Sequence, residues 1–231
     1  AEELWENDNF DQIYITHTPV YDLLTKFHDP DPEKTRYIKV WGNHDLYWKD
    51  HQDIYQSLFP GMQIYEAVIL NDTILMIHGH QADPMCSGPV AAMSQFFVNH
   101  IWADLQRGGV KDPTRAAANP GLCNEVDERL HKWAANNDRG IATIIAGHTH
   151  RAVFENLSLS EIHLQTIRFK TVEIEPLEAK RDPRYYNTGS CVHPLSITGL
   201  EISFDDKIRY RLIKWHCDTD RNMLGVKRVV L

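Results

Sequence analysis

Several features that would assign this chain to a common class of protein are absent from its sequence. No apolar run approaches the roughly 18 residues that a membrane-spanning helix requires, so we expect no membrane span. The four cysteines are far apart and form no Cys-x-x-Cys pair; they are Cys86, Cys123, Cys191 and Cys217. With many histidines and no evident disulfide framework, the pattern favours a reducing, cytoplasmic location.

The chain also has no excess of basic over acidic residues and no glycine-rich phosphate-binding loop. The net charge is −8 and the pI is near 5.9, which argues against an extended nucleic-acid surface but leaves room for a nucleotide substrate. No Gly-x-x-x-x-Gly-Lys loop suggests a kinase or ATPase. The chain does have 42% hydrophobic residues over 231 positions and no low-complexity linker. We therefore expect one domain over residues 1–231.

Three histidine-bearing strings are the most informative feature that is present. Each follows an apolar, β-branched run typical of a buried strand, and functional groups gather at the carboxyl ends of strands in open α/β sheets. The strings are Gly42-Asn43-His44-Asp45, His78-Gly79-His80 and Gly147-His148-Thr149-His150. Together they predict a metal centre, because imidazole binds first-row ions such as zinc and iron, while carboxamide oxygen suits manganese.

The spacing of the third string indicates two ions. His148 and His150 are two positions apart, so in an extended chain both side chains lie on one side, roughly 7 Å apart. That spread suits two cations separated by about 3.5–4 Å.

The three strings, in this order, resemble the last three motifs of the calcineurin-like metallophosphoesterases, over roughly residues 1–190. The resemblance implies an α/β fold, a four-layer metallophosphoesterase-like sandwich of two mixed β-sheets flanked by helices. It also implies two divalent metal ions (manganese, iron or zinc). By position, Asn43, His78 and His148 correspond to ligands of one metal, and His150 to a ligand of the other.

The resemblance also implies the chemistry. A metal-bound hydroxide would hydrolyse a small phosphorylated substrate, a monoester, diester or pyrophosphate, including one linked to a nucleotide or a lipid. His44 corresponds to the general acid or transition-state stabiliser, with Asp45 as its orienting partner. Arg151 is a candidate for binding a phosphate oxygen, with a surface ion pair as the equal alternative. His80 as a direct ligand and His193 near the site are less favoured.

Two motifs with which the family begins, Asp-x-His and Gly-Asp-x-x-Asp/Glu, do not appear whole. Ala1-Glu2-Glu3 looks like the tail of the second motif, so we interpret the chain as N-terminally incomplete, in preference to a processed or degenerate form. We expect an upstream Asp-x-His and a Gly-Asp directly before Ala1. A polypeptide truly starting at Ala1 should bind at most one ion, weakly.

Residues 87–135 carry two helical patterns, one starting near Ser87 and one near Pro120. They are either core-packing helices or a helical cap over the site, at the point where the related UDP-2,3-diacylglucosamine hydrolases have an insertion. Elsewhere we expect a helix over residues 18–27 and a short helix that ends at Leu58. Hairpins are expected around residues 71–72 and 205–206.

Other classes fit less well. A metallo-β-lactamase-type hydrolase would need an Asp-His pair shortly after His150, where the sequence has Arg151-Ala152-Val153. An amidohydrolase would need many more βα units. The remaining alternative is a catalytically inactive metallophosphoesterase-fold binding scaffold. Because such a loss normally erodes the motif histidines, and all are present, we favour an enzyme and leave its oligomeric state open.

Overall fold

Helices and β-strands are interspersed along the chain. The computed structural model describes residues 9–31, 33–86, 120–136, 140–154, 184–191, 196–218 and 225–230. The predicted mixed α/β class is thus confirmed. The chain divides into two compact units, Ala1–Val68 with Pro84–Asp112, and Ile69–Asp83 with Pro113–Leu231.

The first unit begins with helix α1, Phe10–Thr25. The Asn9 side chain caps it by accepting a hydrogen bond of 3.2 Å from the Gln12 amide. The helix is kinked at His17, where φ is −115°, just before Pro19. Proline removes a backbone donor and crowds the preceding turn, which explains the kink. The sequence predicted only the segment after the kink.

An aromatic core holds the first unit together. Trp48, Tyr55 and Phe59 are fully buried, and the Trp48 ring lies 4.9 Å from those of both Phe10 and Tyr55. These edge contacts are favourable arrangements of aromatic quadrupoles. The core is surrounded by strand β1 (Lys39–Val40), its parallel partner β2 (Ile64–Tyr65), the 3-10 helix η1 (Asn43–Lys49) and helix α2 (Gln52–Gln56).

The second unit is built on a five-stranded sheet. Its strands are β3 (Ala67–Leu70), β4 (Ile74–Ile77), β5 (Thr143–Ala146), β7 (Arg184–Thr188) and β6 (Ala152–Val153), in that spatial order. Strands β4, β5 and β7 are parallel. The predicted hairpin between β3 and β4 is confirmed, and Asn71 and Asp72 both have positive φ, as a two-residue primed turn requires.

A second, antiparallel sheet consists of β8 (Ser196–Phe204), β9 (Ile208–Asp218) and β10 (Gly225–Val230). Strands β8 and β9 form the second predicted hairpin, with Phe204 paired to Ile208 across the turn. Residues of this sheet, including Leu200 and Tyr210, pack against Ile74 and Tyr186 of the five-stranded sheet.

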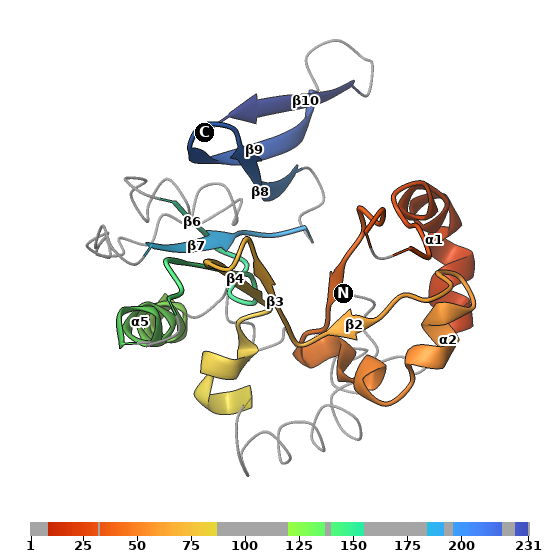
Figure 1. Ribbon diagram of the computed structural model, residues 1–231, viewed down its shortest axis with the longest axis horizontal. Coiled ribbons are helices and arrows are strands. Elements are labelled where there is room, and N and C mark those ends of the chain that lie inside the picture. Colours follow the sequence, from red (N-terminus) through yellow and green to blue (C-terminus); the bar gives the residue numbers. More distant parts are fainter. Residues whose placement is uncertain are drawn as a thin grey trace, which may run out of the picture. The chain divides into compact units, whose positions relative to one another are not determined.

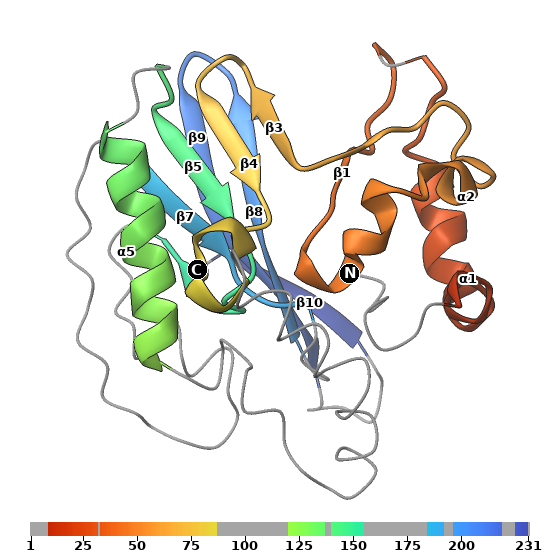
Figure 2. The ribbon, with the colours of Figure 1, turned by 90° about the horizontal axis from the view of Figure 1, so that it is seen from below.

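Helix α5, Pro120–Asn136, covers the opposite face of the five-stranded sheet (Figures 1 and 2). Its Val126 and Leu130 pack against Leu75 and Ile144, so the described residues of the second unit form three layers: helix, sheet and sheet. Within residues 87–135, the second helical pattern thus forms α5, whose Val126 and Leu130 are buried in the core, whereas the first lies outside the described residues. A cap over the site stays a prediction.

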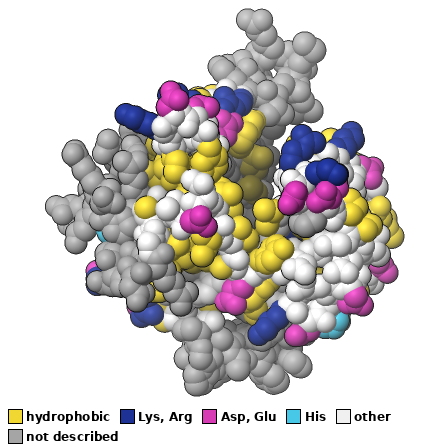
Figure 3. Space-filling model, in the orientation of Figure 1, with side chains coloured by type: hydrophobic (Ala, Val, Ile, Leu, Met, Phe, Trp, Pro, Cys, Tyr) yellow, Lys and Arg dark blue, Asp and Glu magenta, His cyan; other side chains and the backbone are white. Residues whose placement is uncertain are grey.

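No helix in the described ranges is long and apolar enough to span a membrane. On the face drawn in Figure 3, basic and acidic side chains are interspersed among the described residues, without one large basic area. This distribution agrees with the acidic composition of the chain.

Candidate metal centre

Two of the three predicted strand ends meet in the second unit. Strands β4 and β5 are parallel, with Met76 opposite Ile145, and the Gly147 amide continues the pairing by donating a 2.9 Å hydrogen bond to the His78 carbonyl. The two motif histidines therefore emerge at the same edge of the sheet. Their rings, those of His78 and His148, have centroids 5.3 Å apart.

Backbone conformation brings these strand ends close. Gly79 has φ of 110°, and a Cβ there would lie 3.2 Å from the His148 Cβ. His148 and His150 also adopt the left-handed region, with φ of 67° and 55°. The predicted extended geometry of this pair is therefore wrong, since the chain turns directly after β5. Non-glycine residues held in this region are strained, and such residues cluster at functional sites.

Asp83 joins this group, although the sequence did not single it out. It follows the single turn η2 (His80–Ala82), which brings its carboxylate back over the strand end. Its Oδ2 lies 2.8 Å from His148 Nε2, and the two side chains are 4% and 7% exposed. The only signal for Asp83 in the sequence is that a carboxylate follows His78 by five positions. The contact itself could not be predicted, because Asp83 and His148 are 65 positions apart in the chain.

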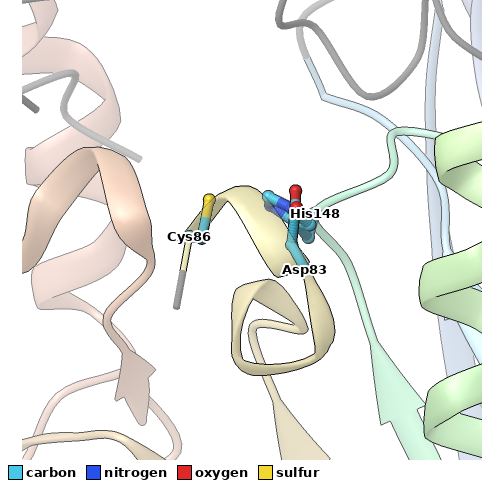
Figure 4. A group of neighbouring side chains, drawn as sticks. All are labelled: Asp83, Cys86 and His148. Atoms are coloured by element: carbon cyan, nitrogen blue, oxygen red, sulfur yellow. The ribbon is translucent and has the colours of Figure 1, made fainter. Parts of the chain in front are cut away.

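Figure 4 labels Asp83 and His148, together with Cys86. Cys86 belongs to the segment assigned to the first unit. We therefore restrict the assigned group to Asp83 and the histidines of the second unit.

His80 is a buried neighbour of the pair. Its ring lies 5.3 Å from that of His78 and 6.5 Å from that of His148. Burial, reinforced by the nearby His148 and opposed by Asp83, lowers the pKa of His80 to about 4. Its imidazole is therefore neutral near pH 7, the form that packs without desolvating a charge. A direct ligand role for His80 stays a secondary prediction.

His150 points to the turn that follows β7. Its Nδ1 lies 3.5 Å from the Ser190 hydroxyl, and Gly189 takes a φ of 83° in the turn. The turn is formed by Asn187-Thr188-Gly189-Ser190. His193 lies outside the described residues.

A buried polar network supports the histidine loop from behind. Asn187 donates hydrogen bonds of 2.6 Å to the Gly147 carbonyl and 3.1 Å to the Thr149 hydroxyl. The Tyr185 hydroxyl lies 3.0 Å from the same amide and donates a 2.6 Å hydrogen bond to Asp127 of α5. Because buried polar groups are costly when unpaired, this network fixes the course of the loop.

Arg151 belongs to this network. Its guanidinium pairs with Asp127 and donates a 2.8 Å hydrogen bond to Asn124, and the residue is only 3% exposed. The alternative of a surface ion pair is corrected: the ion pair exists, but it is buried against α5. Binding a phosphate would require the guanidinium to give up these partners, so the substrate role of Arg151 stays a prediction.

The first string lies in the first unit, where Asn43 and Asp45 are buried and His44 is half-buried. Asp45 accepts a 2.5 Å hydrogen bond from the Gly42 amide, and its carboxylate lies 3.6 Å from the Lys39 ammonium. These contacts hold the loop after β1. The placement of this string against the histidines, and the orientation of His44 by Asp45, stay predictions.

The residues present fit a divalent cation. Asn43 Oδ1 is a buried oxygen without a hydrogen-bond partner among the described residues, and such an atom is costly unless a cation or donor meets it. In the second unit, the candidate donors His78, His148 and His150 are imidazoles, common ligands of first-row metals.

In comparisons with known proteins, no family model matches the chain. Neither the search of curated proteins nor that of solved structures gave a match.

Proposed function

We propose that this chain is a metal-dependent phosphoester hydrolase of the calcineurin-like metallophosphoesterase type, with the four-layer sandwich of that family. One observation carries the proposal: His78 and His148 stand at the carboxyl ends of adjacent parallel strands, with ring centroids 5.3 Å apart. Sheets of this kind bind ligands at that edge, and paired imidazoles there are suited to a metal.

Two divalent ions would supply an acidified water and neutralise the phosphoryl oxygens. His78, His148 and Asn43 would hold one of them, and His150 would contribute to the other. Among the side chains of this protein, His44 would protonate the leaving oxygen or stabilise the charge that develops on the phosphoryl group. Small phosphorylated compounds, including nucleotide- or lipid-linked ones, are the proposed substrates, and the cytoplasm the proposed location.

The test compares turnover and metal content in the full-length protein. With added manganese, the wild type should hydrolyse bis-p-nitrophenyl phosphate or p-nitrophenyl phosphate. His44→Ala should keep its metal but lose about 10²-fold or more in turnover. His17→Ala, which changes an exposed histidine, is the matched control and should behave as wild type.

Two outcomes would overturn the proposal. A wild type that binds metal but hydrolyses neither ester would be a binding scaffold of this fold rather than an enzyme. A wild type that binds no divalent metal would remove the basis of the site altogether. Full activity in His44→Ala would refute only the role given to that residue.

A further inference from the structure

We propose that Asp83 is a positioning residue of the metal centre, which fixes the tautomer of His148 so that its Nδ1 is the metal-binding nitrogen. This inference deepens the proposed function and rests on it. It starts from a contact between two side chains of the same unit, Asp83 Oδ2 and His148 Nε2, at 2.8 Å.

The chemistry of the two groups sets the direction of this hydrogen bond. An ionised carboxylate only accepts hydrogen bonds, whereas a neutral imidazole has one nitrogen that donates and one that accepts. With Nε2 facing Asp83, the ring proton lies on Nε2 and the lone pair on Nδ1. A metal requires such an unprotonated nitrogen, and a carboxylate behind a ligand histidine also raises the basicity of the ring.

Burial and local structure make the contact firm. Asp83 is 3% exposed, and its own amide donates a 3.0 Å hydrogen bond to the His80 carbonyl, which closes the turn η2. Gln81 supports the same turn by accepting a 3.1 Å hydrogen bond from the Gly79 amide. On the other side, the left-handed backbone at His148 limits where its ring can point. The hydrogen bonds of turn η2 and the backbone conformation at His148 therefore restrict the positions of the carboxylate and of the imidazole ring.

Two variants of Asp83 separate its possible roles. Asp83→Asn keeps an oxygen that can accept the Nε2 proton but removes the charge, and Asp83→Ala removes both. If Asp83 positions His148, the cobalt dissociation constant should rise by about 10–100-fold in Asp83→Ala and by less in Asp83→Asn. The visible spectrum at saturating cobalt should stay unchanged, because no ligand is lost. Asp205→Asn, an exposed aspartate in the turn after β8, is the matched control.

A second readout needs no metal. Ring ¹⁵N chemical shifts of the metal-free protein, assigned with His148→Ala, should show the Nε2–H tautomer in the wild type. Asp83→Ala should shift His148 toward the Nδ1–H tautomer. Circular dichroism and the Tm establish that each variant is folded, and Asp83→Asn carries the test if Asp83→Ala is not.

The results distinguish this inference from the proposed function. Unchanged tautomer and unchanged cobalt affinity in both variants would overturn it and leave Asp83 a packing residue. An altered cobalt spectrum at saturation would overturn it in another way, since Asp83 would then be a ligand itself. A tautomer shift together with no cobalt binding by the wild type would refute the proposed metal site while leaving the control of His148 by Asp83 intact.

Discussion

The side-chain amide of Asn187 donates a 2.6 Å hydrogen bond to the carbonyl oxygen of Gly147, and so ties strand β7 to the loop that carries His148 and His150. The same side chain accepts a 3.0 Å hydrogen bond from the Gly189 amide. One fully buried residue thereby connects the loop after β5 with the turn after β7.

Replacing Asn187 should destabilise the protein. Asn187→Ala removes the side-chain donor to the Gly147 carbonyl, which keeps only its 2.8 Å hydrogen bond from the Thr149 amide, and the donor to the buried Thr149 hydroxyl. We therefore expect the free energy of unfolding to fall by about 3 kcal/mol. Asn187→Asp should lower the free energy of unfolding more at pH 8 than at pH 5, because only the protonated acid can donate a hydrogen bond to the Gly147 carbonyl. Urea titrations at the two pH values measure both effects, and a change below about 0.5 kcal/mol in Asn187→Ala would refute the role of this network.

The buried pair of Arg151 and Asp127 gives a second prediction. Arg151→Met leaves an uncompensated buried carboxylate and should lower the free energy of unfolding by about 3–5 kcal/mol, whereas Arg151→Met with Asp127→Leu should recover much of the loss. Denaturant unfolding of the two single variants and the double variant completes the cycle. If Arg151 instead binds the substrate phosphate, KM should rise in Arg151→Met with stability nearly unchanged.

Gly79 tests the close approach of the two strand ends. Gly79→Ala should lower the free energy of unfolding by about 1–3 kcal/mol and weaken metal binding, because the backbone has positive φ and the new Cβ would crowd His148. Gly140→Ala is a matched control: its φ is 74° but nothing lies within 4 Å of a Cβ there. Equal metal affinity in the two variants would show that crowding at His148 is unimportant.

Much of the fold follows from local sequence patterns. The hairpins around residues 71–72 and 205–206 and the helix that begins at Pro120 are all found, because short turns and helical periodicity are encoded within one segment. The first half of α1 was missed because its Ile13, Ile15 and Thr16 are β-branched and give little helix propensity. That segment is stabilised by packing of Phe10 on Trp48 and Tyr21.

Part of the site could also be predicted from local sequence patterns. The approach of His78 to His148 follows from two strands that each end in a histidine motif, since parallel strands align their carboxyl ends. The contact of Asp83 with His148 and the pairing of Arg151 with Asp127 do not follow, because each joins residues far apart in the chain. Their geometry is decided by turns and packing that no single segment specifies.

Cys123 provides a prediction about pH. Burial is the largest of several influences that raise the pKa of its thiol from 9.0 to about 12. Below pH 9 both folded and unfolded chains keep the proton, so this contribution to stability is fully present. Above pH 9 only the unfolded chain releases it, and the contribution is lost as the pH rises toward 12.

We therefore expect the thiol of Cys123 to account for about 1 kcal/mol of lost stability between pH 9 and pH 10. Urea unfolding at these pH values, under reducing conditions, should show a smaller loss in Cys123→Ala than in the wild type. Identical pH dependence in the two proteins would mean that the thiol is solvated or already ionised.

His78 and His148 are proposed to bind the same divalent metal ion, and metal content after saturation with manganese and dialysis tests this proposal. Wild type and His17→Ala should retain equal amounts, while His78→Ala and His148→Ala should each lose the ion bound between these two histidines. Full metal retention in both folded single variants would contradict the claim.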